Sequence, residues 1–182
     1  MKNFYLLNIA FLFMISIGFS QERKITKSGT ITFEASVPSF EEVKATNNSV
    51  SCILNTNTGE LASLALVKGF RFKVALMEEH FNENYIESNK YPKATFKGTI
   101  KNFNLMSLST DVPKTLVLNG ILSIHGKTKE ITTSVTLKKI KNDIELQSQF
   151  IVTPSDFDIH IPKVVSKKVA ETVTIKIDFL LK

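Results

Sequence analysis

The strand pattern of this chain is clearest at residues 173–181, VTIKIDFLL. Apolar residues occupy every second position from Val173 to Leu181, and polar residues such as Thr174 and Lys176 stand between most of them. A period of two is typical of a β-strand with one face buried, because successive side chains point to opposite sides of a sheet. This stretch therefore predicts a strand with an apolar inner face and a largely polar outer face.

The same alternation recurs along the chain before that strand. Clear segments lie at residues 31–37, 116–124, 131–137 and 144–152, and weaker ones at 50–56, 60–67 and 94–103. With the last strand, the pattern predicts about eight strands and a mainly all-β fold.

Short turns separate several of these segments, at residues 57–59, 125–127 and 141–143, and they consist of residues that tolerate turn dihedral angles. Such turns leave no room for the crossover helices that parallel strands require, so we expect antiparallel neighbours.

One segment breaks the period: Met77, Phe81 and Tyr85 stand four apart, which predicts one short amphipathic helix from Met77 to Ile86. An irregular segment, 153–168, is expected to cross one end of the sheet.

Eight antiparallel strands can form a sandwich or a closed barrel. Several segments span about ten residues, which would give a wall roughly 25 Å high at a tilt near 40°. A barrel also removes exposed strand edges. An eight-stranded antiparallel β-barrel is therefore the preferred prediction, with an interior that either fills with side chains or holds one small ligand.

The first twenty residues differ from the rest. Lys2 is followed by an almost uninterrupted apolar run from Phe4 to Phe19, and the run ends in small residues at Gly18 and Ser20. This pattern predicts a secretory signal peptide at residues 1–20, cleaved near Ser20, and a periplasmic or secreted protein. An N-terminal membrane anchor is the alternative. Residues 21–182 are then expected to form a single domain.

Composition excludes several classes of protein. The 182 residues include 23 Lys plus Arg against 17 Asp plus Glu, one Cys and no Trp. A single Cys excludes a disulfide framework and a Cys-rich metal site. Only Arg23 and Arg71 are arginines and the lysines are scattered, so nucleic acid is not an expected partner. The basic excess allows peripheral contact with a membrane, and the pattern does not indicate an oligomeric state.

No catalytic or metal-binding pattern can be assembled from the chain. His80, His125 and His160 are far apart, without the close spacing that metal sites often have. The sequence predicts no catalytic residue, no metal and no cofactor, and hence a protein that is not an enzyme.

Several motifs are more specific than the strand pattern. They are GFRF at 69–72, MEEHFNENY at 77–85, YPKATFKG at 91–98 and LNGILSIHGKTK at 118–129. Their order and spacing resemble the YceI-like family of secreted lipid-binding proteins. IHIP at 159–162, followed by Val173-Thr174-Ile175, is similar to the branch of that family common in Bacteroidetes-type bacteria.

The resemblance covers about residues 69–181 and implies an elongated, lipocalin-like barrel. In that family the barrel encloses a polyisoprenoid tail, such as that of a quinone or a prenyl-carrier lipid. The resemblance implies binding without chemistry, with an apolar isoprenoid lipid as the partner.

Candidate ligand-binding residues are the apolar side chains expected on the inner face or beside the helix. They are Phe33, Leu64, Leu66, Phe70, Phe72, Phe81, Tyr85, Phe96, Leu118, Leu122, Phe150 and Phe179. Phe70, Phe72, Phe81 and Tyr85 are expected to form a lid. For each of the twelve a core position is the alternative, because inward strand residues look alike in both cases. His80 and Arg71 are candidate contacts for a polar head group, although a surface position is the alternative for His80.

Three functions follow from these patterns. The first is a carrier, store or sensor of an isoprenoid lipid. The second is a non-enzymatic stress-response or surface protein with a packed barrel. The third is an isomerase or cyclase, which would need a charged or His side chain deep in the cavity.

Overall fold

The computed structural model describes residues 22–38 and 40–182, and the predicted signal peptide lies outside them. Nine strands occur in this part of the chain. Their bounds are β1 Arg23–Glu34, β2 Lys44–Asn55, β3 Glu60–Leu66, β4 Arg71–Phe72, β5 Lys93–Ile100, β6 Lys114–Ile124, β7 Lys127–Ile140, β8 Asp143–Val152 and β9 Val173–Leu181.

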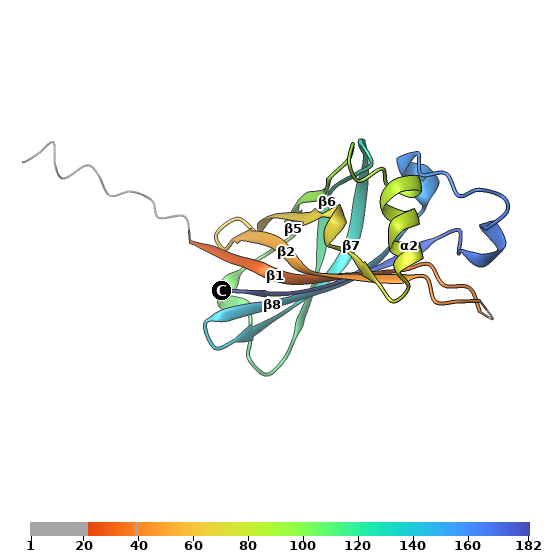
Figure 1. The fold of residues 1–182 in the computed structure, drawn as a ribbon. Helices are drawn as coiled ribbons and strands as arrows, with labels where there is room; N and C mark the ends of the chain where they lie inside the picture. Colours follow the sequence, from red (N-terminus) through yellow and green to blue (C-terminus); the bar gives the residue numbers. More distant parts are fainter. Residues whose placement is uncertain (1–21, 39) are drawn as a thin grey trace, which may run out of the picture.

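Eight of these strands close into a barrel (Figure 1). The order is β1-β9-β8-β7-β6-β5-β3-β2, and β1 also pairs with β2, so the wall has no free edge. All pairs are antiparallel. The short β4 adds to one end of β2. The prediction of an eight-stranded antiparallel barrel with one short helix is confirmed, and the sandwich alternative is wrong.

The turn between β6 and β7 illustrates how local sequence sets the strand register. His125 and Gly126 alone connect Ile124 to Lys127, with φ angles of 52° and 74°. Two residues with positive φ form the type of turn whose twist matches antiparallel strands, and Gly adopts this conformation without strain. From this turn β6 pairs with β7 along the full length of β6, as far as Lys114 opposite Leu137.

The single α-helix in the described residues, α2, spans Ala75–His80 and continues into a wider π-helical turn, η2, at Phe81–Tyr85. In this turn the amide of Ile86 donates to the carbonyl of Phe81 at 3.0 Å. The helical segment therefore begins two residues before the predicted start at Met77 and ends one residue before the predicted end at Ile86. No helix in the described ranges has the length and apolar character needed to span a bilayer.

The two ends of the barrel are built differently (Figure 1). One end carries the short turns 56–59 and 141–142, the loop 101–113 and the C-terminus. The other end carries the loop 35–43, the segment 67–92 that contains α2, and the segment 153–172 that contains the 3-10 turns η4 (Pro154–Phe157) and η5 (Ser166–Lys168). We refer to these as the turn end and the helix end.

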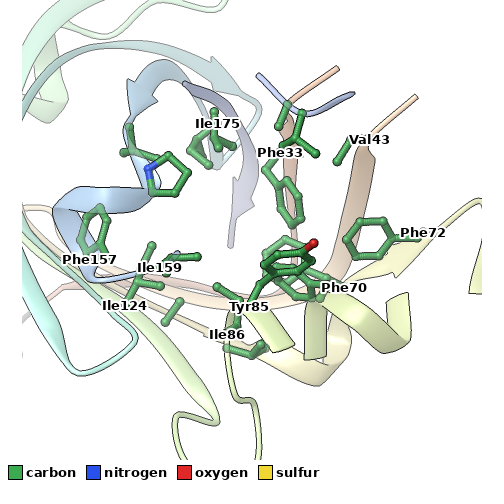
Figure 2. Close-up of a pocket in the computed structure, with 18 of the residues that line it drawn as sticks. Phe33, Val43, Phe70, Phe72, Tyr85, Ile86, Ile124, Phe157, Ile159 and Ile175 are labelled. Carbon is green, nitrogen blue, oxygen red and sulfur yellow. The ribbon is translucent and has the colours of Figure 1, made fainter. Parts of the chain in front are cut away.

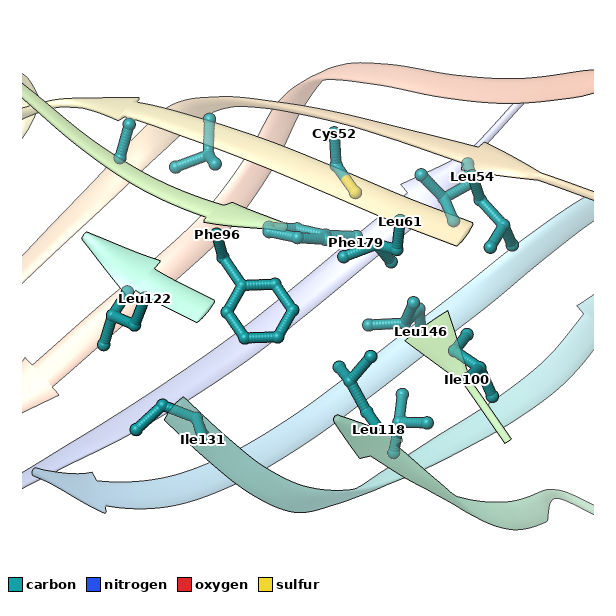
Figure 3. Packing of buried hydrophobic residues seen from close by; sticks show 14 of the residues in the cluster. Cys52, Leu54, Leu61, Phe96, Ile100, Leu118, Leu122, Ile131, Leu146 and Phe179 are labelled. Carbon is teal, nitrogen blue, oxygen red and sulfur yellow. The ribbon is translucent and has the colours of Figure 1, made fainter. Parts of the chain in front are cut away.

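The core fills the half of the barrel nearest the turn end (Figure 3). Side chains from both halves of the sheet meet there and are almost inaccessible to solvent: Val50, Cys52, Leu54, Ile100, Leu118, Val135, Leu137, Ile144, Leu146, Phe179 and Leu181. Cys52 is a free, buried thiol, and burial raises its pKa from 9.0 to about 12. This half of the barrel is therefore a packed core.

Candidate functional site

The half of the barrel nearest the helix end is hollow. It contains a cavity of about 540 Å³ that continues to an opening among the segments at that end. Figure 2 shows Phe33, Val43, Tyr85, Ile124 and Ile175 directed toward this space from different elements. A volume of this size is in the range of pockets that hold one small apolar molecule.

The wall of the cavity continues the inner faces of the strands. In β9 the same alternation that predicted the strand places Val173, Ile175 and Ile177 in the lining. In β6 and β8 the lining residues are Leu122, Ile124, Phe150 and Val152. The hollow half thus has the same aliphatic and aromatic character as the packed half.

Four phenylalanines form one side of the wall, beneath α2. Phe33 of β1 lies 5.3 Å from Phe70, 5.6 Å from Phe72 and 5.2 Å from Phe81 between ring centroids. Phe72 and Phe81 are 5.2 Å apart. Aromatic rings at these distances attract each other beyond simple burial, so the cluster holds the helix against the barrel rim.

The ring of Phe96, shown among the core side chains in Figure 3, forms the floor of the cavity. This side chain lines the cavity and also belongs to the packed core, and it is 8% exposed. Gly98 and Gly120 pair with each other across β5 and β6, and a Cβ atom on either would lie within 2.8 Å of the Phe96 ring. The two glycines therefore provide the space in which this ring lies against the wall.

Two of the segments at the helix end, 67–92 and 153–172, are joined through His125. Its Nε2 lies 2.9 Å from Oε2 of Glu87, and its Nδ1 lies 2.9 Å from the carbonyl oxygen of Phe157. The ring of Tyr91 packs edge-on against it, at 4.5 Å between centroids. His125 thus connects the β6–β7 turn to the α2 segment and to the segment that follows β8.

Polar groups in the cavity are few and lie mainly at its opening. The charged or imidazole side chains in the lining are Glu41, His80 and Lys168, and all three residues are exposed. Farther in, the polar lining residues are Ser63 and Thr95. No cluster of three or more His, Cys, Asp or Glu side chains suited to a metal occurs among the residues described. The interior is therefore suited to an apolar guest.

Comparison with known proteins supports this description. The family of YceI-like domains matches residues 16–181. This chain belongs to the YceI-like family. The match spans nearly all of the sequence, including the whole barrel.

Solved structures with the same fold are distant in sequence. A polyisoprenoid binding domain from Saccharophagus degradans, implicated in plant cell wall breakdown, has a TM-score of 0.76 at 13% identity, covering 88% of this YceI-like chain and 97% of that one. BcnA of Burkholderia cenocepacia has a TM-score of 0.68 at 17% identity, with coverage of 84% and 96%. A Campylobacter jejuni YCEI protein has a TM-score of 0.59 at 15% identity, with coverage of 80% and 89%. No curated protein shows a significant match to the sequence.

Most of the predicted site residues of this YceI-like barrel come together at the cavity. Those in the lining are Phe33, Phe70, Phe72, Phe81, Tyr85, Phe96, Leu122 and Phe150, with His80 at the opening. Phe70, Phe72, Phe81 and Tyr85 lie under and beside α2, where the lid was expected.

Leu64 and Leu66 do not line the cavity. In β3 the residues that line it are Ser63 and Ala65, so Leu64 and Leu66 have the opposite parity, and Leu66 is 54% exposed. Placing these two leucines on the inner face was therefore wrong. Small side chains face inward at this position, and Ser63 pairs across the sheet with Phe96.

Leu118 and Phe179 do point inward, but they lie in the packed half and not in the cavity lining. A Cβ on Gly29 would lie 2.4 Å from the Phe179 ring, so this ring fills the space above that glycine.

Arg71 lies outside the cavity, where its guanidinium donates to Oε1 of Glu78 at 2.6 Å and to the carbonyl of Lys68 at 3.0 Å. Its expected contact with a head group is replaced by this surface ion pair.

The irregular segment after β8 supplies lining residues that the candidate set omitted. They are Pro154, Phe157, Ile159, Ile161, Val165 and Val169. Phe40 and Leu76, from the loop after β1 and from α2, were omitted as well. The spacing of Ile161, Val165 and Val169 was the available signal, since every fourth residue is apolar. The prediction that this segment crosses one end of the sheet agrees with its place at the cavity opening.

Proposed function

We propose that this protein binds a long apolar lipid of the polyisoprenoid class by enclosing its tail in the cavity, as a carrier or store and not as an enzyme. The observation that carries the proposal is the half-hollow barrel, with about 540 Å³ of apolar space open at one end. The Saccharophagus degradans domain, which has the same fold, is described as polyisoprenoid-binding. That likeness supports an isoprenoid in preference to other apolar molecules.

The cavity volume sets the length of tail that could be enclosed. If each carbon atom takes up about 30 Å³, the volume of one molecule in liquid water, a cavity of 540 Å³ would hold about 18 carbon atoms. This corresponds to between three and four five-carbon isoprene units. Burial contributes about 0.8 kcal/mol per carbon, or roughly 4 kcal/mol per unit. Burial of about two units would supply the roughly 8 kcal/mol that corresponds to micromolar binding. Burial of the remaining units would offset the cost of ordering the tail.

The cavity also weighs against the two other candidate functions. A barrel packed solid would leave no such space, whereas only the turn-end half is filled here. An isomerase or cyclase would need a charged or His side chain deep in the lumen, and among the described lining residues those groups stand at the opening. Both observations favour binding.

We also propose that the protein acts outside the cytoplasm, in the periplasm or after secretion. The support is the pattern of the first twenty residues, with a charged start, an apolar run and a small-residue end. An isoprenoid lipid is poorly soluble in water, so a carrier with a closed apolar cavity would suit transfer through an aqueous compartment.

Two experiments test lipid binding. Purified protein is extracted with organic solvent and the extract analysed by mass spectrometry, and delipidated protein is titrated with farnesol and geranylgeraniol. We expect a co-purifying isoprenoid lipid and saturable uptake of both alcohols at one molecule per chain. An extract without apolar lipid, together with no uptake of either alcohol, would overturn the proposal.

A matched pair of variants locates the binding. Ala65 lines the cavity and Leu66, the next residue, is exposed on the outer face. Ala65→Phe is expected to weaken binding of geranylgeraniol at least tenfold because the ring occupies cavity space, and Leu66→Phe is expected to bind like the unaltered protein. Circular dichroism and thermal melting confirm that both variants fold. Equal affinities in the two variants would place the ligand elsewhere.

A further inference from the structure

We infer that the helix end of the barrel docks on an anionic lipid bilayer, with residues 159–170 as the main contact. This inference rests on the proposed function for its purpose, which is loading and unloading of the lipid. Its test uses vesicles without any isoprenoid and is independent of ligand uptake. Three observations carry it: exposed apolar side chains at the opening, an unpaired group of lysines, and the division of residues 159–170 into two faces.

Exposed apolar side chains surround the opening on three separate elements. Phe40 in the loop after β1 is 47% exposed, Leu76 on α2 is 57% exposed and Val164 in the last segment is 84% exposed. Phe40 and Leu76 also line the cavity, so they stand at its lip. The amide of Ala170 donates to the carbonyl of Ala35 at 2.8 Å, which places the first and third of these elements side by side. Apolar groups arranged this way can enter the interface of a bilayer together.

The charges of residues 159–170 are all positive at neutral pH. Lys163, Lys167 and Lys168 are exposed, and there is no Asp or Glu in this stretch. No ion pair to an acid is found for these three lysines within the described ranges. Their charge is therefore available to an external anion.

Several other cations at the same end are paired. Lys127 lies 2.7 Å from Asp158, Lys129 pairs with Asp156, and Arg71 pairs with Glu78. Acidic groups also flank the proposed surface in the sequence: Glu41 and Glu42 beside Phe40, Glu78 and Glu79 beside Leu76, and Glu171 after the lysines. Glu42 pairs with Lys44 at 3.6 Å and Glu78 with Arg71 at 2.6 Å. Residues 159–170, the main contact, carry only basic charge, which complements the negative surface of a bilayer rich in anionic lipids.

Residues 159–170 have one face toward the cavity and another toward solvent. Ile161, Val165 and Val169 are half-buried and line the cavity. Lys163, Val164 and Lys167 lie between them in the sequence and are exposed. When Val164 and the lysines lie against lipid headgroups, the cavity lining is therefore on the other side of the same segment. The bilayer is thus placed next to the opening through which a tail would pass.

The first test measures binding to vesicles by cosedimentation, with vesicles of phosphatidylcholine alone and with added phosphatidylglycerol. We expect binding only with phosphatidylglycerol and a steep loss of binding as salt is raised. A variant with Lys163→Gln, Lys167→Gln and Lys168→Gln is expected to bind about 100-fold more weakly, since each lysine near an anionic surface contributes about a factor of five. The control variant carries Lys101→Gln, Lys141→Gln and Lys182→Gln, three exposed lysines at the turn end. It has the same change in net charge and is expected to retain binding.

The second test uses the absence of Trp from the sequence. A single tryptophan introduced by Val164→Trp reports on this surface alone, and Met106→Trp reports on the turn end, where Met106 is 90% exposed. We expect a blue shift of emission on adding phosphatidylglycerol vesicles for the first variant only. No vesicle binding by the unaltered protein, equal loss in both lysine variants, or a shift at position 106 alone would overturn the inference. Uptake of geranylgeraniol by the unaltered protein and by Val164→Trp, a residue outside the cavity lining, separates this failure from failure of the proposed function.

Discussion

Phe96 determines the depth of the cavity. Its ring closes the hollow half where Gly98 and Gly120 leave room for it, and the packed core begins directly beneath. Two other aromatic residues of the described lining, Phe70 and Phe157, also belong to the buried cluster, and both come from the segments at the helix end. The identity of residue 96 should therefore control how long a tail can enter.

We predict that Phe96→Ala shifts binding toward longer isoprenoid alcohols. Removing the ring extends the cavity downward, so the affinity for geranylgeraniol should rise relative to that for farnesol, while stability falls by about 3–5 kcal/mol. Binding of a series of prenyl alcohols measures the shift, with urea unfolding run alongside. Phe179→Leu is the control, because Phe179 lies in the packed half and its loss should lower stability without changing the length preference. An unchanged preference in Phe96→Ala would contradict the assignment of the floor.

Cys52 gives a second prediction at the level of one side chain. Burial raises its pKa from 9.0 to about 12, so the folded protein keeps the thiol neutral where the unfolded chain would ionise it. The free energy of unfolding should be unaffected by this group below pH 9 and should fall as the pH rises toward 12. Thiol reagents should label native protein very slowly at pH 8 and unfolded protein rapidly.

The contribution of Cys52 is isolated by comparison with Cys52→Ala. The difference in unfolding free energy between the two proteins should shrink as the pH increases from 9, because ionisation of the thiol in the unfolded state favours unfolding of the unaltered chain alone. Rapid labelling of the folded protein would show that the thiol is accessible, and the burial described for it would be wrong.

Individual strands differ in how much their sequences reveal. In β9 the alternation is regular and gives the inner face directly, as found for Ile175 and Ile177. In β3 the run from Leu61 to Leu66 has apolar residues at both parities, so periodicity cannot choose a face. The larger leucines were the natural choice for the interior, yet Ser63 and Ala65 line the cavity, and Ser63 pairs across the sheet with the aromatic Phe96.

The position of a residue along the barrel axis is a second quantity that periodicity does not contain. Leu118 and Leu122 share one face of β6, but the first lies in the packed core and the second lines the cavity. The difference depends on which end carries the long segments, and this follows from the closed sheet as a whole. The residues of the segment after β8 were missed for a related reason: the spacing of Ile161, Val165 and Val169 suggests a shared face, but it does not indicate that this face lies over the cavity.

At the scale of elements, His125 is expected to hold the helix end together. Its ring contacts Glu87, Tyr91 and the carbonyl of Phe157, which belong to two different segments. We predict that His125→Ala lowers the free energy of unfolding by about 2 kcal/mol, the net contribution of two hydrogen bonds, and the melting temperature by about 4–8 °C. Differential scanning calorimetry measures both.

Hydrogen exchange distinguishes this connection from a general loss of stability. In His125→Ala, exchange should accelerate most in residues 67–92 and 153–172, with the strands of the turn end less affected. His160→Ala is the control, since His160 is exposed in the same segment and has no hydrogen bond or ion pair within the described part of the chain. Uniform acceleration along the chain would contradict the role of His125 as a local connection.

The whole molecule combines a packed half and a hollow half within one continuous sheet. The packed half supplies the buried apolar surface that stabilises the fold, so the hollow half can leave its inner surface uncovered without unfolding. A ligand that fills the cavity would add burial in the folded state alone.

We therefore predict that bound isoprenoid raises the melting temperature. At a free concentration 100 times the dissociation constant, binding contributes about 2.7 kcal/mol, which corresponds to about 5–10 °C for a domain of this size. Thermal melting with increasing geranylgeraniol measures the shift. Ala65→Phe, with its cavity partly filled, should show a much smaller shift at the same concentration, and equal shifts in both proteins would indicate that the alcohol stabilises the fold from another site.

The pairing of β1 with residue 182 has a practical consequence. The amide of Ile25 donates to the carbonyl of Lys182 at 2.9 Å, and the amide of Lys182 donates back at 3.0 Å. The start of the barrel and residue 182 therefore lie together at the turn end, opposite the opening (Figure 1). A protein immobilised on a bead or sensor chip through either of these positions would present its opening to the bulk solution, so uptake and release could be followed at a surface without obstruction by the attachment.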